Sequence, residues 1–192
     1  MLKTSAERRG GAAHAQPSAD VATLRVIPPM TRLAFRCRSA AIEAAERALG
    51  LSLPRIACRA SVAEDLAALW LGPDEWLILC SERAGNELIA SAKAALAAIP
   101  HAFVDVSHGS AGLLVEGAQA PLLLNHGCPL DLSLSEFPVG MCTRTVLGKA
   151  EIVLWRTAED SFRVEMRRSY ETYVWSLLQE AQHDTAMSTQ LP

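Results

Sequence analysis

The 192-residue sequence has no excess of basic residues. It contains 18 lysines and arginines against 21 aspartates and glutamates, which gives a formal net charge of −3. A surface without a positive field does not concentrate phosphate groups, so nucleic acid is not an expected partner. The longest apolar runs, such as Leu66–Leu71 and Trp76–Cys80, fall far below the roughly 20 residues that cross a bilayer. We therefore expect a soluble protein with no membrane contact.

The cysteines lack the spacing of a disulfide framework or a metal site. They contain no C-x-x-C pair, and the five of them are scattered at Cys37, Cys58, Cys80, Cys128 and Cys142. An odd, scattered set is typical of reduced thiols in the cytoplasm. The N-terminus has no signal peptide either, because no apolar segment separates Arg8-Arg9 from Ala13-His14-Ala15. These absences predict a cytoplasmic protein.

Motifs of the common catalytic classes are missing too. The sequence has no G-x-G-x-x-G, no G-x-x-x-x-G-K-[ST], no H-E-x-x-H and no G-x-S-x-G. Each of these motifs would indicate one chemistry: dinucleotide binding, nucleoside triphosphate binding, zinc proteolysis and serine hydrolysis, respectively. The chain therefore offers no glycine loop for FAD or NAD.

The composition is that of a globular domain. Half of the residues are hydrophobic and 20% are charged, which is enough to bury a core in one compact unit that can have two lobes. Residues 1–20 are rich in Ala, Gly, Ser and charge and have no hydrophobic period, so we expect a flexible N-terminal tail. The predicted domain covers residues 21–185, and a flexible C-terminus is expected at 186–192.

The hydrophobic pattern predicts strands that arrive in hairpins, with helices between groups of strands. From Thr31 a period-two pattern sets apolar Leu33, Phe35 and Cys37 against Arg32, Arg36 and Arg38, which predicts a half-buried strand with its arginines in solvent. Further strands are expected at Ala67–Leu71, Trp76–Cys80, Phe103–Val106, Gly112–Val115, Thr143–Leu147, Glu151–Trp155 and Phe162–Met166. Helices are expected at Ala40–Leu49, Asn86–Ile99 and Pro121–Asn125, and after a capping Ser169. This order predicts an α+β fold with mainly antiparallel sheets.

Two local clusters could carry chemistry. Asp105, Ser107 and His108 are the residue types of a catalytic triad, but triad members are normally brought together from distant positions, and a polar turn explains the segment better. His126 and Cys128 could form an activated thiol or part of a metal site. Because two ligands do not make a metal site, we interpret this segment as a helix end with a buried cysteine.

Three other groups have a functional and a simpler interpretation. Asp74 and Glu75 could act as an acid and base pair, although a hairpin tip normally places such carboxylates in solvent. Four tryptophans could stack a planar cofactor, but their positions favour a core or a subunit interface. They are Trp70, Trp76, Trp155 and Trp175. The arginines of the Thr31 strand could bind a carboxylate or another subunit, and a plain exposed face is the simpler interpretation.

Several segments, in the same order along the chain, resemble the gamma subunit of heterotetrameric sarcosine oxidase. They are Leu69–Leu77, Val104–Gly109, Gly127–Leu132, Phe137–Cys142 and Leu147–Ala150, within a match from about Val21 to Gln182. Asp105–His108 and Gly117–Ala120 also resemble the folate-binding domains of aminomethyltransferases. The resemblance implies a two-lobed, folate-binding aminomethyltransferase-like fold with a ferredoxin-like lobe.

The family resemblance implies an accessory role without an active site in this chain. Such a complex of alpha, beta, gamma and delta subunits oxidises sarcosine to glycine, passes the methylene carbon to tetrahydrofolate or releases it as formaldehyde, and forms hydrogen peroxide. By the same resemblance FAD, FMN, NAD, tetrahydrofolate and zinc belong to other subunits. No catalytic, cofactor-binding or metal-binding residue is assigned to this chain.

The alternative is a stand-alone folate-binding protein or an aminomethyltransferase of the same fold. It requires a pocket in which a buried carboxylate bonds the pterin. Asp105 and Asp131 are the candidates for that carboxylate. A regulatory protein that binds another small metabolite is a third, weaker possibility.

Overall fold

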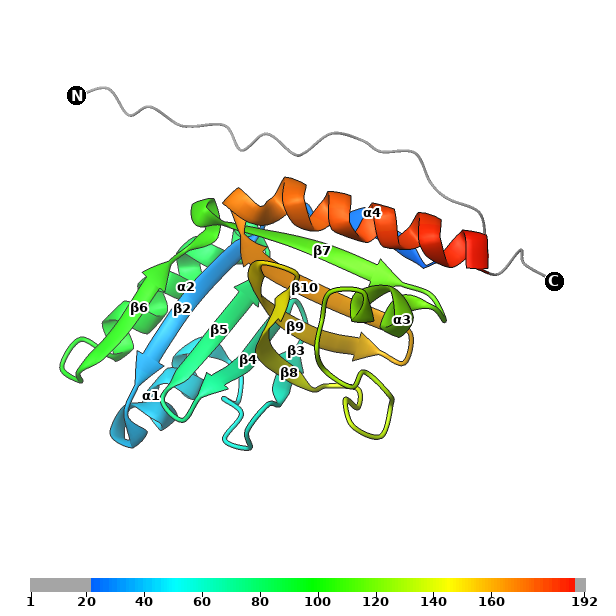
Figure 1. Cartoon of the computed structure of the whole chain (residues 1–192). Coiled ribbons are helices and arrows are strands. Elements are labelled where there is room, and N and C mark those ends of the chain that lie inside the picture. Colours follow the sequence, from blue (N-terminus) through cyan, green and yellow to red (C-terminus); the bar gives the residue numbers. More distant parts are fainter. Residues whose placement is uncertain (1–21, 189–192) are drawn as a thin grey trace, which may run out of the picture.

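The computed structural model describes residues 22–188 (Figure 1). The tail predicted at 1–20 lies outside the described residues. Of the tail predicted at 186–192, residues 186–188 belong to the last helix, α4 (Glu171–Ser188), and the rest lies outside the described residues. The predicted boundary at residue 185 therefore falls inside α4.

The first sheet forms a ferredoxin-like lobe. Its strand order is β3-β4-β5-β2-β6, and all of its neighbouring strands are antiparallel. The strands are β2 (Thr31–Cys37), β3 (Ala60–Ala63), β4 (Leu66–Gly72), β5 (Glu75–Cys80) and β6 (His101–Asp105). With the helices α1 (Ser39–Leu49) and α2 (Glu82–Ala95), the chain order is β2-α1-β3-β4-β5-α2-β6. Without the short edge strand β3, this is the βαββαβ unit of ferredoxin-like folds. The predicted ferredoxin-like lobe is confirmed.

The second sheet is also antiparallel, with the order β1-β7-β10-β9-β8. Its strands are β1 (Thr23–Val26), β7 (Ser110–Glu116), β8 (Cys142–Leu147), β9 (Ala150–Ala158) and β10 (Ser161–Arg167). This lobe also contains α3 (Ala120–Asn125), α4, and the short 3-10 helices η1 (Ser107–Gly109) and η2 (Arg168–Tyr170). Because β1 pairs here before β2 joins the first sheet, the described part of the chain starts in this lobe and then passes to the other.

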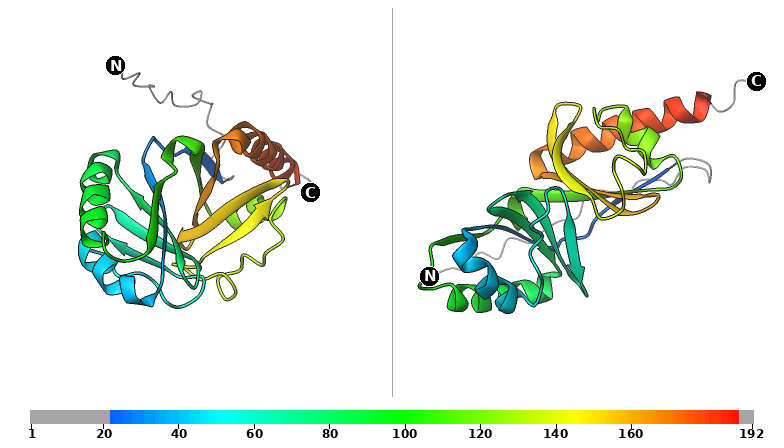
Figure 2. Two further views of the ribbon diagram at one scale, coloured as in Figure 1. Left: turned by 90° about the vertical axis from the view of Figure 1, so that its left-hand side faces the viewer. Right: turned by 90° about the horizontal axis from the view of Figure 1, so that it is seen from below.

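The molecule has four layers, with the two sheets in the middle and helices outside (Figure 2). One core lies between the first sheet and α1 and α2, and includes Phe35 and Trp76. Another lies between the second sheet and α3 and α4, and includes Phe137 and Phe162. A third, smaller core joins the sheets themselves and contains Ala67, Leu69, Leu77, Leu79, Cys142 and Trp155. The α+β class and the two-lobed architecture are thus confirmed.

Four features of the fold differ from the sequence prediction. β1 and β3 were not predicted; each has four residues and lies at a sheet edge. α2 spans Glu82–Ala95 and not Asn86–Ile99. It begins earlier because the Ser81 side chain accepts a hydrogen bond from the Ala84 N–H. Ser169 lies inside η2 and does not directly precede α4. Arg32 is buried.

Within residues 22–188, no helix is both long and apolar enough to span a membrane.

Candidate functional site: the cleft between the sheets

A cavity of about 570 Å³ lies between the inner faces of the two sheets. Its lining comes from β4, β5 and β2 on one side and from β8, β9 and β10 on the other. The floor is largely apolar and includes Ala34, Leu77 and Val153. The polar lining groups include two ion pairs that connect one sheet to the other, Arg32 with Glu165 and Arg144 with Glu75.

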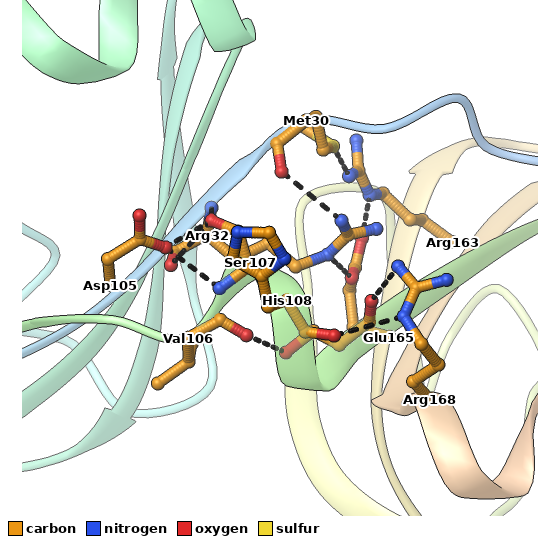
Figure 3. Close-up of polar contacts among 10 residues, drawn as sticks. Met30, Arg32, Asp105, Val106, Ser107, His108, Arg163, Glu165 and Arg168 are labelled. Atoms are coloured by element: carbon orange, nitrogen blue, oxygen red, sulfur yellow. Dashed lines mark hydrogen bonds and ion pairs between the residues drawn. The ribbon is translucent and has the colours of Figure 1, made fainter. Parts of the chain in front are cut away.

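The Arg32–Glu165 pair is a buried clasp between the lobes (Figure 3). Arg32 on β2 is only 2% exposed, and its Nε lies 2.5 Å from a carboxylate oxygen of Glu165 on β10. The second oxygen of Glu165 accepts from Arg163 Nε at 2.6 Å. Arg163 also contacts the sulfur of Met30. A buried charge is tolerated only when it is paired and hydrogen-bonded. The Glu165 carboxylate, which Arg32 and Arg163 share, therefore fixes the position of β2 relative to β10. The prediction that Arg32 faces solvent is wrong.

A glycine makes this close approach possible. Gly112 on β7 lies opposite Glu165 in the register. A Cβ at this position would lie 2.7 Å from Arg32 Nη2 and 2.9 Å from Glu165 Oε1. Any side chain there would displace the ion pair, so Gly112 keeps the space that the clasp occupies.

The Asp105–His108 segment is a polar turn next to this clasp. The Ser107 hydroxyl is buried, accepts from the Arg32 N–H at 2.8 Å and also bonds the Asp105 carboxylate. The Ser107 N–H donates to Asp105 Oδ1 at 2.8 Å. His108 is exposed, and its carbonyl accepts from Arg168 Nε at 3.0 Å. These hydrogen bonds pair backbone groups where the chain crosses from β6 to β7. The interpretation as a polar turn is therefore confirmed, and the structure does not support a catalytic triad here.

Both carboxylates of the β4–β5 hairpin are paired, and Glu75 lines the cleft. Glu75 contacts Arg144 on β8 and lies 3.8 Å from Arg36, and Asp74 lies 3.5 Å from the same Arg36. Arg36, Arg144 and Asp74 are each more than half exposed. The prediction that the hairpin tip is exposed to solvent is confirmed for Asp74. Glu75 is partly covered by Arg36 and Arg144.

The His126–Cys128 segment ends α3. The Gly127 N–H donates to the Leu124 carbonyl at 3.1 Å, and the Gly127 carbonyl accepts from the Gly148 N–H at 2.9 Å. Cys128 is buried in the core of the second lobe, whereas His126 is exposed. Across residues 22–188, no three His, Cys, Asp or Glu side chains come close enough to hold a metal ion. The helix-end interpretation is confirmed.

The tryptophans belong to the cores. Trp76 is buried, and its indole N–H donates to the Pro54 carbonyl at 2.8 Å. Trp155 is buried between the sheets, and Trp70 and Trp175 are partly buried against the cores of the two lobes. The core interpretation is confirmed for these residues.

The two carboxylates considered for a pterin do not line the cavity. Asp105 bonds Ser107 in the turn just described. Asp131 lies in an exposed loop, where hydrogen bonds from the Ser133 backbone and side chain lower the pKa of its carboxyl. The cleft therefore contains two ion pairs that connect the lobes, and neither candidate carboxylate lines it.

The comparisons with known proteins agree on one family. The model of the sarcosine oxidase gamma subunit family matches residues 36–184. The chain belongs to this family. A sarcosine oxidase subunit gamma from Corynebacterium sp. (strain P-1) is 34% identical over 97% of this chain and 95% of its own length. The counterpart from strain U-96 is 36% identical over 88% and 87%, respectively.

Solved structures support the same relationship. A chain of the heterotetrameric sarcosine oxidase from Corynebacterium sp. U-96, in complex with pyrrole 2-carboxylate, superposes with a TM-score of 0.82. It is 31% identical, and the match covers 88% of both chains. The glycine cleavage system aminomethyltransferase T from Bartonella henselae superposes with a TM-score of 0.61 at 16% identity, over 81% of this chain and 44% of that one. The aminomethyltransferase shares the fold, as the sequence predicted.

Proposed function

We propose that this chain is the accessory gamma subunit of a heterotetrameric sarcosine oxidase and has no active site of its own. The observation that carries the proposal is the match to a sarcosine oxidase structure over 88% of both chains, together with the family match over residues 36–184. Because the similarity spans nearly the whole chain, it supports the same position for this chain in an assembly of the same kind. The expected partners are alpha, beta and delta subunits.

The proposed reaction of the complex is the oxidative demethylation of sarcosine. Sarcosine, tetrahydrofolate and O₂ give glycine, methylenetetrahydrofolate and hydrogen peroxide, so the N-methyl carbon is oxidised and O₂ is reduced by two electrons. We infer that FAD, FMN, NAD, tetrahydrofolate and zinc are bound by other subunits. The lack of a dinucleotide-binding glycine loop in this sequence supports that division. Five cysteines without a disulfide support assembly in the cytoplasm.

The role proposed for this chain is structural. The buried clasp of Arg32, Arg163 and Glu165 holds the lobes in one relative orientation, and a rigid body presents a fixed surface to its partners at a low entropic cost. The Arg32–Glu165 and Arg144–Glu75 pairs of the cleft support this assignment, because each of them connects one sheet to the other.

The test is a purification of the tagged chain from its native cell, with a chain carrying the same tag and expressed alone as the control. The proposal predicts that larger subunits copurify, that the eluate shows flavin absorbance and that it forms peroxide when sarcosine is added. A colourless chain without partners would contradict it. If that solitary chain also binds tetrahydrofolate in a titration, the stand-alone folate-binding alternative replaces the proposal.

A further inference from the structure

The strand β6 is an open edge of the first sheet. It comes last in the strand order β3-β4-β5-β2-β6 and lies at the outer side of the molecule in Figure 1. Among residues 22–188, β6 pairs only with β2. An edge strand has a row of peptide groups without a neighbouring strand, and such a row is a template for pairing with another chain. The outward groups of β6 therefore decide what this edge can bind.

The hydrogen-bond register shows which peptide groups of β6 face outward. The Val106 N–H, just after β6, donates to the Arg32 carbonyl on β2 at 2.9 Å. In an antiparallel ladder, residues alternate between bonding to the neighbouring strand and facing away from it. Ala102 and Val104 therefore bond to β2 as well, and Phe103 between them faces the open side. Within residues 22–188, the N–H and carbonyl of Phe103 have no hydrogen-bond partner.

The side chains of β6 do not protect this edge. Natural proteins commonly protect an edge strand with a lysine, a proline or a bulge. β6 contains no lysine, arginine or proline, and its five pairs with β2 run without a register shift. Its one carboxylate, Asp105, is its last residue and bonds Ser107. The other exposed side chains of β6 are Ala102 and Val104, the latter 52% exposed.

The other three sheet edges are covered or charged. At β3 the Ala60 N–H donates to the Gly140 carbonyl at 2.8 Å, and at β8 the Cys142 N–H donates to the Cys58 carbonyl at 3.0 Å. β1 has only four residues and carries Arg25, whose side chain is 67% exposed. In the described part of the chain, β6 is thus the edge strand with neither an outer backbone partner nor a lysine or arginine.

A strand added at β6 would continue one wall of the cleft. Ala34, which lines the cleft, is the register partner of Val104, so the two side chains share one face of the sheet. On the opposite face, Phe103 packs against the core of the first lobe, with its ring centre 5.4 Å from that of Phe35. An added strand therefore meets Val104 on one face and Phe103 on the other, and apolar residues suit both of its faces.

We propose that β6 accepts an extended segment of a partner subunit as a further strand of the first sheet. This inference rests on the proposed function, which supplies the partner chains. In strand addition, main-chain hydrogen bonds give the affinity and side-chain contacts on the two faces give the specificity. The unpaired peptide groups of Phe103 and the apolar side chains beside them provide both kinds of contact.

The size of this edge favours a partner subunit over a second copy of the chain. β6 has five residues, and strand pairing over that length alone buries far less than the roughly 1,200 Å² at which stable interfaces begin. A subunit that is already bound to the chain by other contacts pairs with the edge at a high effective concentration. The added strand is therefore expected as one part of a larger interface.

Hydrogen exchange of single amides in the purified complex tests the added strand directly. We expect the Phe103 N–H to exchange at least tenfold more slowly in the complex than in the isolated full chain, because only a partner strand can bond it. The N–H groups of Ala102 and Val104 are the internal control, since they bond to β2 and should exchange slowly in both samples. Mass spectrometry with electron-transfer fragmentation resolves these amides.

A competition between two copies of the chain tests the same edge by mutation. A wild-type copy and a variant copy carry different tags and are expressed together with limiting amounts of the partner subunits, and the ratio of the tags is measured in the complex. We expect Val104→Lys to be under-represented more than fivefold, because a lysine on an edge strand opposes pairing. Val104→Thr keeps the shape of the side chain and should give a ratio near one.

A matched charge variant and a stability measurement complete the competition. Val62→Lys places the same charge on β3, where Val62 is 60% exposed. It should also give a ratio near one, because the Ala60 N–H of that strand already has a partner. Equal melting temperatures of the variant and wild-type chains exclude misfolding as the cause of any difference.

The outcomes separate this inference from the proposed function. If the wild-type chain copurifies with no other subunit, the proposed function fails. If the complex assembles but the Phe103 N–H exchanges as fast as in the isolated chain, or Val104→Lys competes equally, only the added strand is wrong. A wild-type chain that dimerises in isolation, with Val104→Lys monomeric, would also overturn the proposal, because a second copy would then occupy the edge.

Discussion

Two arginines of β2 have opposite surroundings and should differ in their effect on stability. Arg32 is buried against Glu165, whereas Arg36 is exposed beside Asp74. Removing one partner of a buried pair leaves a charge without compensation, while an exposed pair contributes little. The two residues therefore provide a matched comparison within one strand.

We expect Arg32→Met to lower the free energy of unfolding by about 3 kcal/mol, at the low end of the range for a broken buried pair because Arg163 still contacts Glu165. Arg36→Met should change it by less than about 1 kcal/mol. Urea unfolding of the two variants measures both values. Equal effects would show that the clasp does not stabilise the contact between the lobes.

The buried thiols predict a loss of stability at high pH. Burial raises the pKa of Cys142 from 9.0 to about 12, and that of Cys37 from 9.0 to about 11. In the unfolded chain these thiols ionise near their ordinary pKa, so between about pH 9 and pH 11 the unfolded state loses protons that the folded state keeps. The free energy of unfolding therefore falls as the pH rises through this range.

The double variant Cys37→Ala/Cys142→Ala isolates that contribution. Its unfolding free energy should fall less steeply between pH 8.5 and pH 11 than that of the wild-type chain, as followed by urea unfolding at each pH. Parallel curves would show that the two thiols ionise alike in the folded and unfolded states. Lower stability of the variant at every pH is expected in addition, because two buried side chains are shortened.

The surroundings of Arg32 could not be predicted from its own strand. The alternation of β2 correctly assigns Leu33, Phe35 and Cys37 to the core, and it correctly places Arg36 and Arg38 in solvent. Arg32 differs because Glu165 covers it, and Glu165 is 133 residues away in sequence. A periodic pattern shows that a strand has two faces, but it does not show that a second sheet covers part of the polar one. Arg156 on β9 was missed as well, because the segment before β8 covers it: Arg156 donates to the carbonyls of Phe137 and Leu132, which lie 19 and 24 residues away in sequence.

Among the elements, the start of α2 depends on a single side chain. The Ser81 hydroxyl accepts from the Ala84 N–H at 3.4 Å, and Glu82 follows in the first turn. We expect Ser81→Ala to lower the free energy of unfolding by about 1 kcal/mol, as for other lost caps. Ser176→Ala, on an exposed position of α4, is the control and should change it by less than about 0.5 kcal/mol. Thermal unfolding of both variants measures the difference, and equal effects would contradict the capping role.

Elements with strong local signals could be predicted, and weakly paired ones could not. The hairpins β4–β5 and β8–β9 and the helix α1, which ends at Gly50 in the left-handed region, follow from turn residues and periodicity. β1 and β3 have four residues each and one neighbouring strand, so long-range pairing and not local pattern decides their structure. The loop 126–141 is likewise fixed by Arg156, which lies beyond it in sequence.

At the scale of the whole molecule, the two lobes pack directly against each other. A small apolar core, a buried three-residue clasp and the backbone bonds between Cys58–Ala60 and Gly140–Cys142 connect them. The Asp105, Ser107 and His108 triad hypothesis does not survive this geometry, since the polar groups there secure the crossing from β6 to β7. Connections of this kind suit the proposed role of presenting a surface to partner subunits.

The most direct test of the accessory-subunit proposal is the mass of the assembled complex. Native mass spectrometry of the complex purified through this chain should show one copy of it with three different larger or smaller subunits, and the same sample should form peroxide when sarcosine is added. The result that would contradict the proposal is a mass equal to this chain alone, or to a multiple of it, in a sample without sarcosine-dependent peroxide.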